Sequence, residues 1–423
     1  MKEDFLHYVW KYQKFNSEEL HTENGESITV IDVGLHNTNS GPDFFNALLT
    51  IDNQVWAGNV EIHSNSSDWY VHQHERDSAY DTVILHVVWV YDAEVFRKNN
   101  TAIPTLVLKP IVPEGILSRY HNLFSKKQKW IPCENEFNRQ GDFMLNNWLE
   151  RLFLERLEYK TIQIDLELKS LNNHWEALFF KLLCKNFGLK VNGDSFLSVA
   201  QSFDFSIVQK CQQSQHNMES LLLGQAGLLD GNKADGYYNS LQKKYCYLRR
   251  KFGLKNENVI AAKYFRLRPV NFPTIRLSQL ATLYSTKKQL FSEIISLKEL
   301  EDYYLFFKVG TSPYWDTHFN FGVTSVRRRK VLTKKFVDLL LINTIIPLNY
   351  CYAKKIGKDV SEELIQLASQ IPREENSIVK KFNDLRPIAF FAYQSQAVLG
   401  LKTNYCDKRR CVDCAIGNAI LKG

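Results

Sequence analysis

The sequence predicts an α+β protein in which a mixed sheet with flanking helices precedes a mostly helical domain. Three observations lead to this prediction. Over residues 1–125, runs of β-branched and aromatic residues alternate with Gly, Asn and Pro, which is typical of strands and turns. Over residues 140–423, apolar residues recur at spacings of three and four, as on one face of a helix. Residues 126–139, which begin KKQKWIPCENE, separate the two patterns as a linker.

In the first domain, a short helix is expected at 3–12, before any strand. The IDNQVW stretch predicts a tight hairpin turn between two of the strands. The continuous VVWV predicts that the last strand is covered on both faces. The strands themselves are expected in four β-rich runs, at 27–34, 43–51, 54–63 and 81–92.

The second domain is expected to be built from helices, the longest of which covers 143–171. The most apolar stretch, 336–348, carries Asp338, Asn343 and Pro347, and is too short and too interrupted to span a bilayer. The N-terminus has no apolar signal region, so the eight cysteines predict a reducing, cytoplasmic location and no membrane partner. Further helical patterns occur at 175–188, 218–229, 275–284, 297–310, 335–346 and 361–371.

Charge is divided unevenly along the chain. Residues 1–125 have a balance of −9, whereas the remaining residues have a balance of +16. In the basic part, Arg and Lys occur in runs, two of them interleaved with Tyr and Phe, which suits phosphate contacts and base stacking. Nucleic acid is therefore the expected partner, with solvated helix faces as the alternative. The arginines expected to contact it are Arg249, Arg250, Arg266, Arg268, Arg327, Arg328 and Arg329.

The GNVEIHSN stretch places two polar side chains on one face of a strand. Because alternate residues of a strand point the same way, Glu61 and His63 share a face, about 7 Å apart. Asp43 opens the preceding run, and antiparallel pairing would bring its carboxylate close to that of Glu61. Two carboxylates suit a hard divalent cation that keeps several waters and binds phosphate oxygens. The third position would orient or deprotonate an attacking water.

These residues resemble the motif of the PD-(D/E)XK nuclease superfamily, whose core runs helix–strand–strand–strand–helix–strand. Pro42-Asp43 matches the first half of the motif, and Glu61-Ile62-His63 matches the second half, except that histidine stands where the motif has lysine. The resemblance implies a restriction-endonuclease-like sheet and hydrolysis of phosphodiester bonds in DNA or RNA. It also implies that Asp43 and Glu61 hold Mg²⁺ or Mn²⁺, with His63 at the lysine position.

The missing lysine leaves the activity open. Between Lys14 and Arg97 the single formal cation is Arg76, so no lysine nearby in sequence replaces it. An imidazole at position 63 suits a base and a metal ligand equally well. The chain is either a nuclease with a histidine in its motif or a non-catalytic nucleic-acid-binding or scaffold protein on a degenerate nuclease fold.

A histidine-rich segment, DWYVHQHERD, follows this strand. If the segment is extended, His72 and His74 share a face. Together with His63 and an acidic residue, they offer the imidazole and carboxylate ligands that suit Zn²⁺, Mn²⁺ or Fe²⁺. This predicts a second metal beside the first, or a histidine/carboxylate metallohydrolase with another substrate. His86, inside the apolar fourth run, is expected to be a core residue.

Cys406, Cys411 and Cys414 form a C-x4-C-x2-C pattern before a predicted terminal helix. The helix N-terminus and the adjacent DKRR sequence predict lowered thiol pKa values and therefore good metal ligands. Zn²⁺ or an iron–sulfur cluster would need a fourth ligand, for which Cys133 and Cys351 are candidates. Free or redox-reactive thiols are the alternative.

Over nearly its full length, the chain is similar to a bacterial family defined as a domain of unknown function. The similarity rests on GPDF, VEIH, SDW, LLLGQAGLL, LRPVNFPTIR and the ending CDKRRCVDCAIG. The family implies no activity, so the functional predictions depend on the residues described above.

Overall fold

A mixed N-terminal sheet followed by helices confirms the predicted α+β fold. The computed structural model describes residues 2–124 and 129–422. The chain is 54% helical and 12% strand. Residues 126–128 of the predicted linker lie outside the described residues.

The chain forms two units. Unit 1 consists of Met1–Trp148 together with Leu401–Gly423, and unit 2 consists of Leu149–Gly400. The boundary falls inside helix α4 (Asp142–Ser170). The sequence patterns place the C-terminal 23 residues with the helical part, whereas the structure packs them in unit 1.

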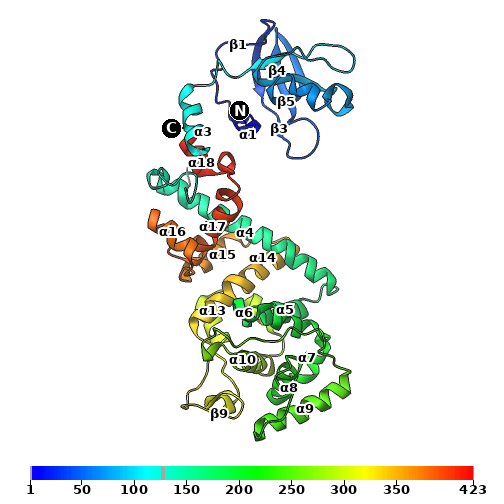
Figure 1. Cartoon of the computed structure of the whole chain (residues 1–423), viewed down its shortest axis with the longest axis vertical. Coiled ribbons are helices and arrows are strands. Elements are labelled where there is room, and N and C mark those ends of the chain that lie inside the picture. The colour runs from blue at the N-terminus through cyan, green and yellow to red at the C-terminus, as the bar shows by residue number, and fades with distance from the viewer. Residues whose placement is uncertain (1, 125–128, 423) are drawn as a thin grey trace. The chain divides into compact units, whose positions relative to one another are not determined.

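Unit 1 is built on a seven-stranded sheet with the spatial order β1-β2-β4-β5-β6-β7, in which β3 pairs with β4 (Figure 1). Helix α1 (Glu3–Lys11) precedes the sheet and packs against β5 through a buried apolar face. The strands are β1 (Leu20–His21), β2 (Ser27–Asp32), β3 (Leu35–His36), β4 (Phe44–Ile51), β5 (Gln54–Asn65), β6 (Val83–Val90) and β7 (Thr105–Val107).

Strand direction changes at β5. Strands β2, β4 and β5 are antiparallel neighbours, whereas β5, β6 and β7 run parallel. The turn between β4 and β5 has positive φ angles of 47° at Asp52 and 65° at Asn53, which is the two-residue hairpin predicted from IDNQVW. In β6, residues 83–88 are all buried, as expected of a strand covered on both faces, whereas Trp89 and Val90 of the VVWV stretch are half-buried.

The segment between β5 and β6 is helical, so the expectation that His72 and His74 lie on an extended segment is wrong. It contains α2 (Asp68–Val71) and two 3₁₀ turns, η1 (His74–Arg76) and η2 (Ser78–Tyr80). Before this helix, the Asp68 carboxylate accepts a hydrogen bond from the Asn65 N–H, which closes a tight turn at the end of β5. A left-handed Gln73, with φ of 61°, then turns the chain between the two histidines.

The C-terminal segment packs against α3 (Glu114–Phe124) within unit 1. The Arg119 side chain donates a hydrogen bond to the Leu421 carbonyl oxygen at 3.1 Å. The segment ends in the helix predicted after the cysteines. The elements of this segment are the π-helical turn η7 (Leu401–Cys406), the 3₁₀ turn η8 (Cys411–Asp413) and α18 (Ala415–Lys422). Unit 1 also contains the 3₁₀ turn η3 (Phe137–Arg139), which precedes α4.

Unit 2 is helical apart from a small hairpin, β8 (His318–Asn320) and β9 (Val323–Thr324). Its helices are the rest of α4, α5 (Trp175–Phe187), α6 (Leu189–Gln201), α7 (Phe205–Cys211), α8 (Gln215–Gln225), α9 (Gly236–Phe252), α10 (Pro273–Thr286), α11 (Leu290–Ser296), α12 (Leu300–Phe306), α13 (Lys334–Leu340), α14 (Ile346–Lys355), α15 (Ser361–Gln370), α16 (Ser377–Leu385) and α17 (Ala392–Gly400), with shorter turns η4 (Pro269–Asn271), η5 (Pro313–Asp316) and η6 (Leu341–Ile345).

The apolar stretch around 336–348 belongs to a continuous helical segment, Lys334–Lys355. This segment is long and apolar enough to cross a membrane, but 67% of its most apolar window is buried inside the protein. Asp338 in this segment accepts a hydrogen bond from the Tyr304 hydroxyl at 2.6 Å. Both features are typical of a core helix.

Candidate metal centre

Asp43 and Glu61 are held together by reciprocal hydrogen bonds between strands β4 and β5. The Asp43 N–H donates to Glu61 Oε2 at 3.1 Å, and the Ile62 N–H donates to Asp43 Oδ2 at 3.0 Å. The β4–β5 pairing shifts register between Phe44 and Ala47, which interrupts the backbone ladder beside these carboxylates. The sheet therefore brings together the two carboxylates that the sequence predicts to be neighbours.

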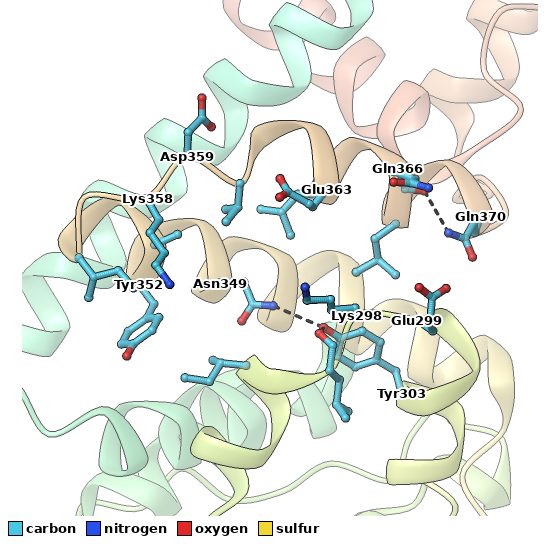
Figure 2. Close-up of a pocket in the computed structure, with 17 residues that line it drawn as sticks. Lys298, Glu299, Tyr303, Asn349, Tyr352, Lys358, Asp359, Glu363, Gln366 and Gln370 are labelled. Atoms are coloured by element: carbon cyan, nitrogen blue, oxygen red, sulfur yellow. Dashed lines mark hydrogen bonds between the residues drawn. The ribbon is translucent and has the colours of Figure 1, made fainter.

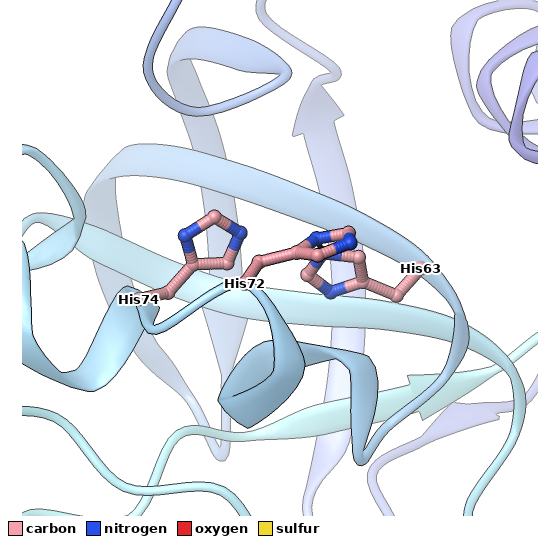
Figure 3. A group of neighbouring side chains, drawn as sticks. All are labelled: His63, His72 and His74. Carbon is pink, nitrogen blue, oxygen red and sulfur yellow. Dashed lines mark hydrogen bonds between the residues drawn. The ribbon is translucent and has the colours of Figure 1, made fainter.

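Three histidines gather beside Glu61, and two of them contact its carboxylate. His63 Nε2 and His74 Nε2 lie 3.5 Å and 3.3 Å from Glu61 Oε1, and His63 Nε2 lies 3.1 Å from His72 Nδ1. One ring nitrogen from each of the three histidines lies within 4.8 Å of the others (Figure 3). Glu61 and His63 are 5% and 2% exposed, whereas His72 is exposed, so the group is open to solvent on the His72 side.

His86 and His7 contact this group from two further elements. His86 on β6 is fully buried, and its Nε2 lies 2.8 Å from His63 Nδ1. His7 on α1 places its Nε2 3.2 Å from Asp43 Oδ2. His86 is thus a core residue, as predicted, but it also fixes the orientation of the His63 ring.

Burial and mutual repulsion shift the pKa values of these side chains. Burial, with the nearby Asp43 charge, raises the pKa of Glu61 to about 9. Burial and the neighbouring imidazoles lower the pKa of His63 to about 2, and burial chiefly lowers that of His86 to about 3. Burial alone would lower the pKa of His7, but Asp43 raises it. His63 and His86 are therefore neutral imidazoles, the form that binds metals.

The donor set fits a transition metal. Neutral imidazoles with one carboxylate suit Zn²⁺, Mn²⁺ or Fe²⁺, whereas Mg²⁺ prefers oxygen ligands. A cation would also remove the cost of burying Glu61 beside Asp43. His63, His72, His74 and Glu61 are therefore the residues that would hold the ion.

A cavity of about 580 Å³ lies beside this centre within unit 1. His7 is the shared residue, because it lines the cavity and contacts Asp43. Four basic side chains and two acidic ones line the cavity, and one of the acidic side chains, Asp413, is paired with Arg410 at 2.9 Å. The cavity therefore has a surplus of positive charge next to the candidate metal ligands. Its basic residues are Lys11, Lys408, Arg409 and Arg410.

A second cavity, of about 520 Å³, lies in unit 2 between α14, α15 and the chain leading into α12 (Figure 2). Its lining mixes charges of both signs, such as Lys298, Glu299 and Glu363, with apolar side chains. Asn349 Nδ2 donates to the Tyr303 hydroxyl at 3.5 Å across part of its wall. The residues singled out from the sequence lie elsewhere, so this cavity is not the candidate site.

The predicted nucleic-acid-binding arginines all lie in unit 2, and all are exposed. Among the described residues, none of them is paired with an acidic side chain. Arg266 stacks over the exposed Phe265 ring, 5.1 Å from its centroid. The set of exposed cations is Arg249, Arg250, Arg266, Arg268, Arg327, Arg328 and Arg329.

His7, Lys408 and Arg409 are site residues that the sequence patterns did not indicate. For His7 a signal existed, because Glu3 and His7 are four residues apart and so share one face of α1. For the two cations no signal existed, because their approach to α1 depends on the packing of the C-terminal segment into unit 1.

His86→Leu tests the role of the second histidine layer. Leucine at position 86 cannot form the hydrogen bond that orients the His63 ring through its Nδ1. We therefore expect metal affinity to fall roughly 10- to 100-fold, which is the usual effect of removing a hydrogen bond to a metal ligand. Competition between the protein and a chromophoric chelator for Zn²⁺ or Mn²⁺ measures this change. His216→Ala, in unit 2, is the control and should leave the affinity unchanged. Unaltered affinity in His86→Leu would show that this layer does not orient the ligand.

The fold and the site define a two-unit α+β protein with a candidate metal centre of histidines and carboxylates on its N-terminal sheet. The chain belongs to the family described as Protein of unknown function (DUF2851), which matches residues 3–377. This match includes the candidate metal centre and ends before the C-terminal cysteines. Comparison with curated proteins and with solved structures found no match. The resemblance to PD-(D/E)XK nucleases stays a prediction.

Proposed function

We propose that this protein is a metal-dependent phosphodiesterase that hydrolyses DNA or RNA, with its metal ion held by Glu61, His63, His72 and His74 beside Asp43. One observation carries the proposal. Glu61 directs one carboxylate oxygen to the histidines and accepts the Asp43 N–H with the other. It therefore joins the nuclease-like motif and the histidine cluster in a single centre.

The order of elements in unit 1 supports the nuclease part of the proposal. Apart from the two-residue strands β1 and β3, helix α1 is followed by three antiparallel strands, β2, β4 and β5, then by the helical segment at α2, then by the parallel strand β6. This is the helix–strand–strand–strand–helix–strand order that the resemblance implies. The Pro-Asp and Glu-X-His residues lie at the start of β4 and in β5, as that resemblance requires.

The geometry favours His63 as a metal ligand over a residue that orients water. Its side chain is buried, its Nδ1 faces His86, and its Nε2 faces His72 and Glu61. Neither ring nitrogen is directed to a substrate. The imidazole ligands also change the expected metal from Mg²⁺ to Mn²⁺, Fe²⁺ or Zn²⁺.

The charge of the adjacent cavity supports a phosphate-containing substrate. Lys11, Lys408 and Arg409 are exposed cations that line it, and they would bind the phosphates on either side of the reacting one. A bound divalent ion would polarise the reacting phosphate and lower the pKa of a coordinated water. The water oxygen bonds to phosphorus as the bond to the leaving sugar oxygen breaks. The leaving oxygen takes up the proton that the water loses, which leaves a phosphomonoester and an alcohol.

Cleavage assays with single metals test this proposal. The wild-type chain is incubated with labelled single- and double-stranded DNA and RNA in Mg²⁺, Mn²⁺ or Zn²⁺, and with a chelator. We expect cleavage in Mn²⁺ or Zn²⁺ that the chelator abolishes. Intact substrates with every metal, together with no hydrolysis of bis(p-nitrophenyl) phosphate, would contradict the proposal. Retarded mobility without cleavage would instead favour a nucleic-acid-binding protein.

A histidine/carboxylate metallohydrolase with another substrate is the second candidate. The three clustered imidazoles favour it, because the PD-(D/E)XK motif itself contains no such group. Metal-dependent hydrolysis of p-nitrophenyl acetate, with no action on the phosphodiester, would support this candidate over the first.

The exposed arginines of unit 2 give a separate prediction about nucleic-acid binding. Replacing Arg327, Arg328 and Arg329 by Ala should weaken nucleic-acid binding by about tenfold. It should also reduce the salt dependence: the slope of log affinity against log salt concentration should become shallower by about 0.7 to 0.9 for each phosphate that the variant no longer neutralises. Fluorescence anisotropy with a labelled oligonucleotide at several salt concentrations measures both quantities.

The control for this prediction is a double alanine variant of Lys334 and Lys335. These cations follow the arginines closely in sequence but are already paired with Glu301 and Glu375. The control should therefore change affinity and slope less than the arginine variant. Equal effects in the two variants would mean that net charge, and not this arginine run, determines binding.

A further inference from the structure

Four cysteines from separate parts of the sequence meet in unit 1. Cys133, Cys406, Cys411 and Cys414 line one small cavity whose other lining residues are mainly apolar. None of them is in a disulfide, and all but Cys406, which is half-buried, are buried. Cys351, the other candidate for a fourth ligand, lies in α14 of unit 2. The structure therefore selects Cys133 as the partner of the C-terminal cysteines.

The thiols interact with one another, and backbone donors support one of them. The backbone N–H groups of Ile416 and Gly417, at the start of α18, bond to the sulfur of Cys414. Burial and the other thiols raise the pKa of Cys133, Cys406 and Cys411, so the prediction of lowered thiol pKa values is wrong for the protein alone. Four cysteine side chains that line one cavity supply the number of thiolate ligands that a tetrahedral zinc or an iron–sulfur cluster needs.

The spacing of the sulfurs distinguishes between metal centres. One Zn²⁺ bound by four thiolates needs sulfurs about 3.8 Å apart, because each Zn–S bond is about 2.3 Å long. In the part of the chain that the structure describes, three donor atoms lie within 4.8 Å of one another in the histidine trio, and no three of the four sulfurs meet this condition. In a [4Fe–4S] cluster each thiolate binds a different iron, so the ligands stand farther apart.

The cysteines enclose a basic loop that reaches the candidate active site. Cys406 and Cys411 stand at the two ends of residues 407–410, and this loop contributes Lys408, Arg409 and Arg410 to the cavity that His7 lines. Arg409 has a positive φ of 53°. Among the described residues, Lys408 and Arg409 form no ion pair. Two of the three cations are thus exposed and available for an anionic ligand.

Contacts around Cys411 and Cys414 hold the ends of this loop. The Asn418 side chain donates to the carbonyl oxygens of Val412 at 2.8 Å and Cys414 at 3.2 Å. The backbone of Gly417 lies so close to Cys411 that an added Cβ would lie 2.8 Å from the Cys411 carbonyl carbon. Within the loop, Asp407 is paired with Lys402 and Arg410 with Asp413, so the cysteines fix the two ends of a segment that also has contacts of its own.

We propose that Cys133, Cys406, Cys411 and Cys414 bind one [4Fe–4S] cluster, which holds loop 407–410 at the cavity beside His7 so that its cations bind substrate phosphates. The cluster itself is independent of the proposed phosphodiesterase function. Its positioning role rests on that function. The two parts are therefore tested by different measurements.

The first measurement is metal content and absorption of the full-length chain purified without oxygen. We expect about four irons and four acid-labile sulfides per wild-type chain, with broad absorption near 400 nm. Cys133→Ser and Cys411→Ser should lose both, whereas Cys351→Ser, a buried cysteine outside the group, should keep them. Zinc without sulfide would overturn the cluster, and iron retained in Cys133→Ser would overturn the ligand set.

The second measurement is oligonucleotide binding by the same variants, followed by fluorescence anisotropy. We expect Cys411→Ser and the double variant Lys408→Ala/Arg409→Ala each to weaken binding by about tenfold, with little further loss when combined. If cluster-free Cys411→Ser binds the oligonucleotide with wild-type affinity, the cluster does not position the loop, although the proposal that the cluster is present would be unaffected. Absence of binding by the wild type would overturn the same role together with the proposed function, while metal content still decides the cluster. Circular dichroism confirms that each variant is folded.

Discussion

Glu61→Gln should abolish metal-dependent phosphodiester cleavage, lowering kcat/KM on the order of 10³-fold or more. The amide keeps the shape of the side chain but removes the charge that faces both the histidines and the Asp43 backbone. A metal bound by neutral imidazoles alone would be held weakly and would lack its bridge to Asp43. Cleavage of labelled DNA or RNA under single-turnover conditions measures the loss.

The same substitution should stabilise the metal-free protein. Glu61 is 5% exposed and lies beside the Asp43 carboxylate, so without a cation its burial is costly. The neutral amide avoids this cost, and we expect the melting temperature of the apoprotein to rise by roughly 2–4 °C per kcal/mol gained. Added metal should stabilise the wild type and leave the variant unaffected. Calorimetry of both proteins, with chelator and with Mn²⁺ or Zn²⁺, gives all four values.

Glu114→Gln is the matched control, because Glu114 is an exposed glutamate at the start of α3 in the same unit. It should cleave, bind metal and melt like the wild type. Full activity in Glu61→Gln would show that Glu61 does not belong to the active site and would contradict the proposed metal centre. A lower melting temperature of its apoprotein would show that Glu61 has a structural role instead.

Gly58→Ala should destabilise unit 1 by about 3 kcal/mol, the upper part of the range for an overpacked interior. Gly58 lies in β5, three residues before Glu61, and its backbone faces β6 closely. An added Cβ would press on the Ile84 side chain and would lie 2.7 Å from the Thr82 carbonyl oxygen. Since the carbonyl cannot turn away without breaking the β5–β6 pairing, the two strands must separate.

The variant should therefore lose metal affinity as well as stability, because Glu61 and His63 on β5 face His86 on β6. Calorimetry and chelator competition measure the two effects. Gly141→Ala is the control, since nothing lies within 4 Å of an added Cβ there. A melting temperature equal to that of the wild type in Gly58→Ala would contradict the close approach of the two strands.

The local sequence pattern was sufficient to predict the main strands and most of the helices. The periodicity of 27–34, 43–51, 54–63 and 81–92 predicts four strands of the sheet, and each occurs with its ends shifted by a few residues. The alternation in β5 places Glu61 and His63 on one face, as the structure shows. These features depend on contacts between residues near in sequence, or between strands joined by a two-residue turn, so the sequence predicts them.

Prediction from the sequence was less complete for the candidate centre. An extended segment was expected at His72 and His74, but a short helix and a left-handed Gln73 form there instead. The two histidines still reach His63, because the helical segment folds back over β5. The hydrogen bonds that Ser67 donates to Asp92, which follows β6, are a long-range effect that periodicity does not contain.

By itself, the sequence determined most of the helices and the main strands of this protein, the face of β5 that carries Glu61 and His63, and the inventory of metal-binding side chains. Only the tertiary structure decided which of these side chains meet. It brought His7 to Asp43, chose Cys133 over Cys351, and placed Lys408 and Arg409 beside the centre. The physical reason is that these contacts join segments up to four hundred residues apart, and long-range packing of the whole core, not local spacing, sets their positions.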